Sequence, residues 1–419
     1  MSLLSAIKAR ALDAADRYTW ATEPWDNFTR PLIGTPNYLS STFAFQENEY
    51  FQDLKDFRRE GLFLSRIPLP EGSPLDLGDS ALWHGIYTAM LAVRWHFVGD
   101  GTSEIMLKAA LQALGKHQTW HGEAQPRLIR GYDPRYPGWA DDASNDTLTG
   151  HFFGIWAVLK WGPVELRDEA EQYLKNICDE LANYNFCLID NNKKPTPHGK
   201  LINGVLTDPL QYTLVHAIFS ALRPYSSRYE FLRQILYKKY KELIPYGKAA
   251  FGNYQNWNDD HRAAMHLLVI SETDPESKEY VRKGVRRMWR YAKKRANPWV
   301  NALLALTETV DRDAFNEMRR QAWMVLGEYD LTARRNEVPV DWREKYKLSP
   351  LWNPTVVTVK GIPRSTQPLP LWARGAQDFF FQRCPFSVVD WQGVTEPMSA
   401  FNAGDWLCAF WFSRLAGLL

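Results

Sequence analysis

The sequence predicts an all-α fold, an (α/α)6 toroid in which six helical hairpins form an inner and an outer ring of helices. Three observations predict it: six segments carry almost no charge, amphipathic segments follow five of them, and strand-like segments are few and short. The chain has 419 residues, of which 45% are hydrophobic and 23% charged, and this suits a large buried core. We therefore expect a single toroid domain over residues 1–419.

The inner ring is predicted from the segments that are poor in charge. A helix that is apolar on every side must be surrounded by protein, so these segments belong in the interior. They span residues 79–98, 145–161, 207–222, 260–270, 297–310 and 404–419.

The outer ring is predicted from segments that have one apolar stripe and one charged face. Five of them follow the first five inner segments and span residues 103–117, 164–184, 229–244, 277–295 and 313–329. Residues 3–20 or residues 47–59 have the pattern of a sixth outer helix, which would pair with the last inner helix. Strand signals are confined to short stretches such as 355–361 and 386–391.

Residues 335–385 interrupt the helical pattern. Prolines recur from Pro339 to Pro385 and exclude long helices, while Trp342, Trp352 and Trp372 add bulk. A loop this long inside a compact domain is often functional. We expect this Trp- and Pro-rich insertion to lie over one end of the toroid and to narrow its cavity.

Charge and cysteine content argue against several classes of protein. Lys and Arg total 50 against 48 Asp and Glu, so a formal charge of +2 gives no global attraction to nucleic acid or to a membrane. The four cysteines lack CxxC spacing, which argues against structural zinc and a dense disulfide framework. Walker A, GxGxxG and GxSxG motifs are missing, and we expect no cofactor.

The first twenty residues alternate apolar and charged positions at helical spacing. They lack the continuous apolar core of a signal peptide, and no run in the chain is long and apolar enough for a membrane span. We therefore expect a protein that is cytoplasmic or released without a signal peptide, with no nucleic acid or membrane partner.

The aromatic content indicates a carbohydrate ligand. The chain has 18 Trp, 19 Tyr and 21 Phe, and many tryptophans stand at junctions between loops and predicted helices. Aromatic rings stack on the C–H faces of sugars while neighbouring polar side chains bind the hydroxyl groups. For any single tryptophan, packing in the core is the alternative.

These features resemble the six-hairpin glycosidase superfamily, which includes unsaturated glucuronyl hydrolases. The resemblance rests on the uncharged inner helices, the acidic loops before them, the Trp-rich junctions and a C-terminus inside the last inner helix. It covers roughly residues 79–419 and is architectural, because no family-specific catalytic motif matches position by position. It implies that a substrate binds in the cavity at one end of the inner ring.

Aspartates stand at the starts of five inner segments. Consecutive inner helices of a toroid run in the same direction, so these starts would share one rim. Aspartate is also a favoured N-cap residue, and capping alone would explain each of them. The five are Asp79, Asp146, Asp208, Asp260 and Asp405.

Glycoside hydrolysis needs two carboxyl groups, one protonated as the acid and one ionised as the base or nucleophile. We expect the pair among four of these aspartates, with Asp146 first, Asp260 second, and Asp79 and Asp208 third. Asp146 leads because a cap does not require the extra acidic residues before it. Substrate contacts are expected from Trp83, His84, Trp139, Asp142, His151, Tyr254, Trp257, His261, Arg262, Trp372 and Asp405.

Three other functions stay open. A polysaccharide lyase needs a Tyr or His base and a neutralising Asn or Arg, and residues 252–262 contain all four types. A toroid can also bind carbohydrate or build a surface or virion structure without catalysis, because fold does not fix function. A terpene-cyclase-like toroid is disfavoured, since the expected metal or acid motifs are not evident.

Two weaker patterns concern metals and polyanions. His117 and His121 are four residues apart, and residues 140–146 are acidic, but neither pattern completes a known metal motif, so we expect no metal. One outer segment carries a basic stripe, which predicts a solvated face and, alternatively, docking of an anionic polymer or partner. The stripe consists of Lys278, Arg282, Arg286, Arg290 and Lys294.

Overall fold

The computed structural model describes residues 66–67, 80–99, 101–132, 139–247, 257–307, 309–328, 355–359, 362–365, 400–401 and 404–419. Within these ranges the fold is all-α, as predicted, with four short antiparallel strand pairs. None of the helices in this part of the chain is long and apolar enough to cross a membrane.

Each of the six charge-poor segments contains a helix. In α5, α7 and α11 nearly every residue is buried, as expected for helices that are apolar on all sides. The six inner helices are α3 (Ser80–Val98), α5 (Asn145–Trp161), α7 (Pro209–Leu222), α9 (Trp257–Thr273), α11 (Pro298–Leu306) and α16 (Gly404–Leu415).

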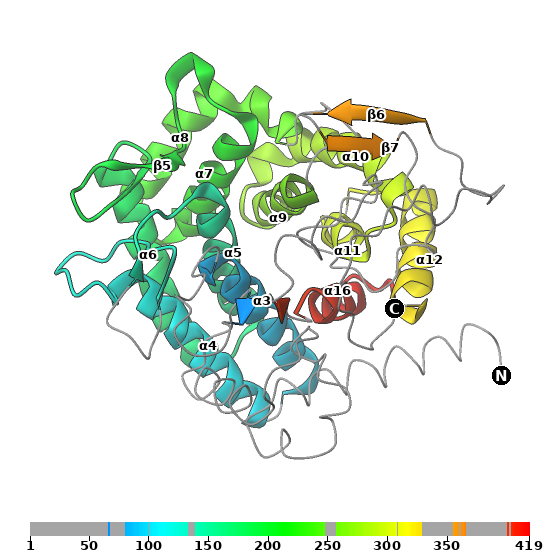
Figure 1. Cartoon of the computed structure of the whole chain (residues 1–419), viewed down its shortest axis with the longest axis horizontal. Coiled ribbons are helices and arrows are strands. Elements are labelled where there is room, and N and C mark those ends of the chain that lie inside the picture. Colours follow the sequence, from blue (N-terminus) through cyan, green and yellow to red (C-terminus); the bar gives the residue numbers. More distant parts are fainter. Residues whose placement is uncertain are drawn as a thin grey trace.

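The five amphipathic segments also form helices, and Figure 1 shows them outside the inner ones. They are α4 (Gly101–Thr119), α6 (Arg167–Asn183), α8 (Ser227–Tyr240), α10 (Lys278–Arg295) and α12 (Arg312–Glu328). In α10 the buried stripe is Val281, Val285, Met288 and Ala292, whereas the basic stripe is exposed as predicted. Short 3-10 helices adjoin them: η4 (Val164–Leu166), η5 (Gly204–Leu206), η6 (Arg223–Tyr225), η7 (Lys241–Tyr246) and η8 (Pro275–Ser277).

The inner helices contact one another in a cyclic order. Helix α3 packs on α5, α5 contacts α7 and α9, α9 packs on α7 and α11, α11 packs on α16, and α16 packs on α3 (Figure 1). Each outer helix packs on the inner helix that precedes it. The complete toroid stays a prediction, because residues 3–20 and 47–59, the candidates for the sixth outer helix, lie outside the described residues.

Helices α3 and α5 meet backbone to backbone along a seam of three glycines. A Cβ atom on Gly85 would clash with the carbonyl of Gly150, and a Cβ atom on Gly154 would clash with the carbonyl of Gly85. A Cβ atom on Gly150 would likewise clash with the backbone of Leu82. Packing therefore explains why α5 has glycine at these positions, because any larger residue would keep the two helices farther apart.

Helices α5, α7 and α9 are joined by side chains and not by main-chain contact. The buried ring of His266 on α9 lies between two threonines, with Nε2 3.1 Å from Thr149 Oγ1 of α5 and Nδ1 3.2 Å from Thr213 Oγ1 of α7. Burial lowers the pKa of His266 well below its usual value, so the ring is neutral at neutral pH. A neutral hydrogen-bonded ring thus links three inner helices.

Aromatic side chains fill the space between three other inner helices. The ring of Trp299 on α11 lies 4.5 Å from that of Phe412 on α16 and 6.3 Å from that of Phe153 on α5, measured between centroids. All three side chains are buried. These three aromatic residues are therefore explained by packing in the core and not by contact with a ligand.

The strand pairs are short and local except for one. β1 (Arg66–Ile67) pairs with β8 (Ala400–Phe401), and so joins two segments far apart in sequence. Hairpins are formed by β2 (Gly131–Tyr132) with β3 (Trp139–Ala140), β4 (Cys187–Ile189) with β5 (Pro195–Lys200), and β6 (Val356–Val359) with β7 (Ile362–Ser365).

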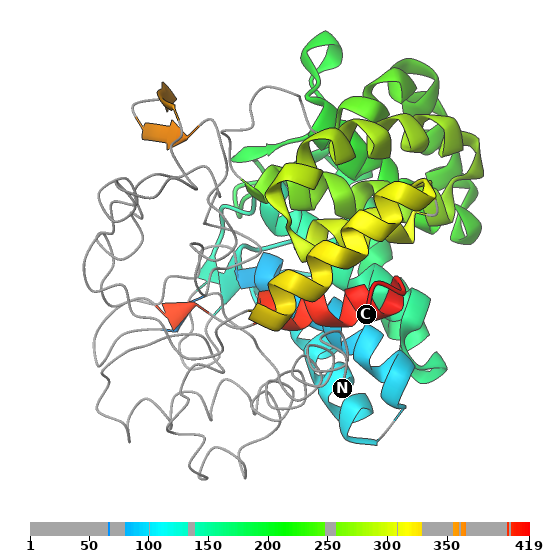
Figure 2. The ribbon, with the colours of Figure 1, turned by 90° about the vertical axis from the view of Figure 1, so that its right-hand side faces the viewer.

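The β6–β7 hairpin is the described part of the insertion at 335–385. Its first strand lies inside the predicted strand segment 355–361, whereas 386–391 lies outside the described residues. Figure 2 shows β6–β7 and β1–β8 on the same side of the helices. The position of the whole insertion over an end of the toroid stays a prediction.

Candidate functional site

The first turns of α5 and α9 are joined by Arg262. Its Nη1 atom donates to Asn145 Oδ1 at 2.6 Å and also binds the carboxylate of Asp146, while Nη2 binds the carboxylate of Asp259. The side chain of Arg262 is 9% exposed and that of Asp146 is 24% exposed. One nearly buried guanidinium therefore holds two carboxylates that solvent can reach, at the starts of two inner helices.

Asp260, the second catalytic candidate, is bound by a different arginine. Arg295, the last residue of α10, forms an ion pair with the Asp260 carboxylate, and both side chains are largely buried. The next residue, His261, accepts a hydrogen bond from Asn297 Nδ2 at 2.9 Å if Nε2 is unprotonated. Since Asn297 also caps α11, this end of α9 is tied to both α10 and α11.

Capping does not account for Asp146. Ser144 caps α5, because its hydroxyl accepts from the Thr147 N–H and the Thr147 hydroxyl accepts from the Ser144 N–H, each at 3.3 Å. The capping alternative is therefore wrong for Asp146. It is confirmed for Asp208, whose carboxylate accepts from two backbone N–H groups of α7 at 2.8 and 3.3 Å.

The two aspartates before the α5 cap bind arginines of the loop after α4. Asp141 binds Arg127, and its Oδ2 accepts from the Asn191 N–H at 2.7 Å. Asp142 accepts from Arg130 at 2.8 Å and is exposed, so it remains a candidate substrate contact. The acidic surplus in this segment therefore fastens α5 to its neighbouring loop and to the β4–β5 hairpin.

His84 and His151 lie in the core, on either side of His117. The ring of His117 is 5.8 Å from that of His84 and 6.0 Å from that of His151. Burial lowers the pKa of His84 to about 4, against a hydrogen bond with a backbone carbonyl, and lowers the pKa of His151 to about 3. Both rings are fully buried and neutral at neutral pH, so packing between α3, α4 and α5 explains them.

The two histidines spaced for a metal make other hydrogen bonds. His117 Nδ1 lies 2.9 Å from the Ala113 carbonyl oxygen, and His121 Nε2 lies 2.8 Å from the Gln118 carbonyl oxygen. Among the residues that the structure describes, no group of three or more His, Cys, Asp or Glu side chains could hold a metal ion.

A second buried polar cluster joins α7, α8 and η8. Asp274 Oδ2 accepts from His216 Nε2 at 2.7 Å, from Ser277 Oγ at 2.7 Å and from Arg233 Nη1 at 3.0 Å. The same Nε2 of His216 faces Ser277 Oγ at 3.2 Å. A nucleophilic triad needs the serine and the aspartate on opposite nitrogens of the ring, so this cluster is structural.

The remaining predicted residues divide into three groups. Trp139, at the start of β3, is 36% exposed and can meet a ligand. Trp83, Trp257 and Asp405 belong to α3, α9 and α16, but their side chains are outside the described part of the structure. Asp79, Tyr254 and Trp372 lie outside the described residues altogether.

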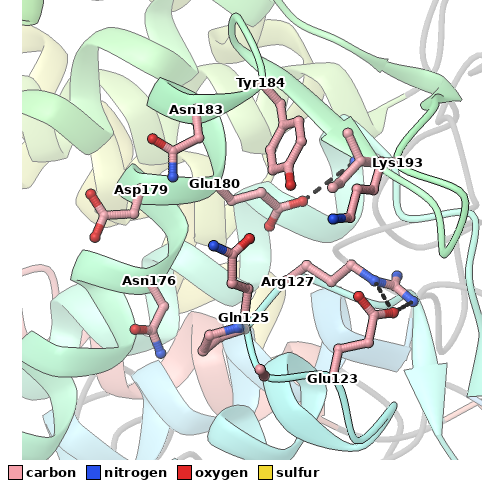
Figure 3. Close-up of a pocket in the computed structure, with 12 residues that line it drawn as sticks. Glu123, Gln125, Arg127, Asn176, Asp179, Glu180, Asn183, Tyr184 and Lys193 are labelled. Carbon is pink, nitrogen blue, oxygen red and sulfur yellow. Dashed lines mark hydrogen bonds and ion pairs between the residues drawn. The ribbon is translucent and has the colours of Figure 1, made fainter.

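A polar pocket of about 510 Å³ lies between α6, the loop after α4 and the β4–β5 hairpin. Figure 3 shows carboxyl, amide and basic side chains around it. Its lining residues are Glu123, Ala124, Gln125, Pro126, Arg127, Asn176, Asp179, Glu180, Asn183, Tyr184, Ile189 and Lys193. No pattern in the sequence predicted this pocket.

Glu180 is the buried carboxyl group of this pocket. Burial raises its pKa to about 8, against hydrogen bonds from the N–H groups of Leu128 at 2.8 Å and Ile189 at 3.4 Å. A sequence signal existed, because Glu180 follows Ile177 by three residues and so falls on the apolar stripe of α6. A carboxyl group on such a stripe is costly unless it is hydrogen-bonded or protonated.

No protein-family model matches the chain, and no curated protein matches it. Among solved structures, the apo structure of a β-1,3-1,4-glucanase from Paenibacillus sp. X4 aligns over 70% of this chain and 90% of that chain, with 10% identity and a TM-score of 0.39. A likeness this distant carries no inference about function.

Proposed function

We propose that this chain is a carbohydrate-active protein, a glycoside hydrolase that acts on an oligosaccharide or polysaccharide at the end of the helices where α5 and α9 begin. One observation carries the proposal. Asp146, Asp259 and Asp260 gather there around two arginines, although the α5 cap does not need Asp146. The exposed ring of Trp139 stands in the loop that leads into α5 and could stack on a sugar.

Hydrolysis adds water across the glycosidic C–O bond. One carboxylate takes a proton from the water, or attacks the sugar and is later released by water, and a carboxylic acid protonates the departing oxygen. Asp146 suits the first role, because its carboxylate is partly exposed and is held in place by the ion pair with Arg262. Asp260 and Asp79 are the proposed sources of the proton.

Non-catalytic carbohydrate binding is the second candidate, and one observation favours it. Asp146 and Asp260 are each held by an arginine, whereas hydrolysis needs one carboxyl group to carry a proton. Arginine-bound carboxylates would still hydrogen-bond sugar hydroxyl groups. Binding of a glycan without its cleavage would support this candidate.

The experiment is a hydrolysis screen of the full-length protein with a panel of α- and β-linked oligosaccharides, read as reducing ends. We expect Asp146→Asn to lower kcat at least a hundredfold, with Asp260→Asn and Asp79→Asn identifying the acid. Asp313→Asn, on the exposed face of α12, is the control and keeps full activity. Cleavage that is unchanged in all three variants would rule out the hydrolase site.

A further inference from the structure

We infer that the pocket between α6, the loop after α4 and the β4–β5 hairpin is a second ligand site, which takes a neutral saccharide of one or two rings. None of its lining residues is among those that gather at Arg262, so the inference goes beyond the proposed function. A volume of about 510 Å³ lies within the range of small-molecule sites, roughly 300–1,000 Å³.

The walls of the pocket are fixed by hydrogen bonds and ion pairs. Asp141 binds both Arg127 of one wall and the tip of the β4–β5 hairpin, the other wall. Glu180 on α6 accepts from Leu128 and Ile189, and so ties the helix to both walls. Fixed walls reduce the entropy lost when a ligand binds.

The hairpin tip is ordered in the same way. Asp190 Oδ1 accepts from the N–H groups of Asn192 and Lys194, each at 2.8 Å, which folds the turn that carries Lys193. Lys193 has φ +58°, in the left-handed region that is uncommon for residues other than glycine. The turn therefore holds a strained backbone at a residue that lines the pocket.

The charges around the pocket are largely compensated. Glu123 pairs with Arg127 at 2.9 Å, and Asp179 pairs with Arg228 at 3.3 Å. Glu180 is protonated at neutral pH because burial raises its pKa to about 8. Lys193 is the charged lining residue for which the described part of the structure shows no ion pair, and it is exposed at the hairpin tip, where water screens its charge. A strongly charged ligand would therefore find only a weak counter-charge here.

Uncharged side chains in the pocket match the chemistry of hydroxyl groups. The amide of Gln125 offers donors as well as an acceptor, and Tyr184 offers a ring and a hydroxyl. The amide nitrogen of Asn183 adds a donor, while its oxygen accepts from Arg228 at 2.9 Å. Figure 3 shows Gln125 reaching from the loop toward the side chains of α6. Among the described residues, the side chains of Gln125 and Tyr184 have no hydrogen-bond partner, so both are available to a sugar.

The test is calorimetric titration of the full-length protein with glucose, galactose, N-acetylglucosamine, cellobiose and chitobiose, and with glucuronic acid and glucosamine as charged counterparts. We expect at least one neutral probe to bind with a Kd of about 1 mM or tighter, and the charged counterparts to bind at least tenfold more weakly. No binding by any neutral probe, or preference for a charged one, would overturn the inference.

Single substitutions test whether the sugar binds in this pocket. Gln125→Ala replaces an exposed loop residue and Tyr184→Ala removes the aromatic face, and each is expected to weaken binding about tenfold. Lys194→Ala is the matched control, since Lys194 adjoins Lys193 in the turn but does not line the pocket. Binding that is unchanged in Gln125→Ala and lost in Asp146→Asn would move the sugar to the α5–α9 end, which overturns this inference and leaves the proposed function intact.

Discussion

Arg262 of α9 binds Asp146 of α5 across 116 residues of sequence. The same guanidinium binds Asp259, so it offsets the repulsion between two carboxylates that approach it from different helices. The pairing fixes the start of α5 against the start of α9, and these two helix starts are the centre of the proposed active site.

Replacing Arg262 by alanine should destabilise the fold by about 1–3 kcal/mol, because it removes the guanidinium that binds both Asp146 and Asp259. The measurement is the free energy of unfolding in urea. The exposed pair of Arg282 and Glu279 on α10 provides the control: Arg282→Ala should change stability by less than about 1 kcal/mol. Equal effects of the two variants would contradict a special role for Arg262.

Gly150→Ala should lower the melting temperature, because the added methyl group has no space against the backbone of Leu82. Overpacking of this kind costs about 1–3 kcal/mol, and a rigid main-chain contact should place it at the upper end. Gly101→Ala, where a Cβ atom meets nothing within 4 Å, should leave the melting temperature the same or slightly higher. If Gly150→Ala melts at the same temperature as the wild type, the close contact between the main chains of α3 and α5 is wrong.

Glu180 should make stability depend on pH. Its pKa is about 8 in the folded protein against 4.5 ordinarily, so the folded state binds the proton more tightly. The resulting stabilisation is complete below about pH 4.5 and disappears as pH rises to about 8, with a slope of at most about 1.4 kcal/mol per pH unit. Unfolding of the wild type and Glu180→Gln at several pH values across this window tests it, and parallel pH profiles would count against it.

Asp274→Ala should be among the most destabilising single changes, at about 3–5 kcal/mol, because it leaves the fully buried Arg233 without its buried partner. Burial alone would raise the pKa of Asp274, but hydrogen bonds from His216 and Ser277 and the charge of Arg233 lower it to about 2. Urea unfolding measures the loss. The exposed Asp313→Ala serves as control, and a loss below about 1 kcal/mol for Asp274→Ala would contradict the network's importance.

The helices could be predicted because charge is distributed locally along the chain. An inner helix such as α5 is uncharged over several turns, and an outer helix such as α10 repeats its buried residues at helical spacing. The strand β6 was also predicted, since its β-branched run is local.

The partners of the acidic residues could not be predicted in the same way. Asp260 binds Arg295 and Asp141 binds Arg127, and nothing in the spacing of these residues distinguishes the arginine that each aspartate meets. The choice is made by helix packing, which brings distant residues together. The capping alternative for Asp146 fails for a more local reason: Ser144, two residues earlier, caps α5, and both residue types are good cap formers.

The predicted role of His84 and His151 shows a further limit. Histidines in a charge-poor helix look like ligand contacts because sequence alone does not tell which side of the helix meets another helix. Here both point into a fully buried cluster, where a neutral ring hydrogen-bonded to a carbonyl or an amide is tolerated.

The glycine seam between α3 and α5 brings the main chains of these two helices into direct contact. Two helices in main-chain contact have no side-chain rotamers between them to rearrange, so they should shift only as one rigid body. The junction of α5 with α7 and α9 is different, because it passes through the hydrogen bonds of His266 to Thr149 and Thr213. If the end of the ring opens to admit a polymer, α3 should therefore travel with α5.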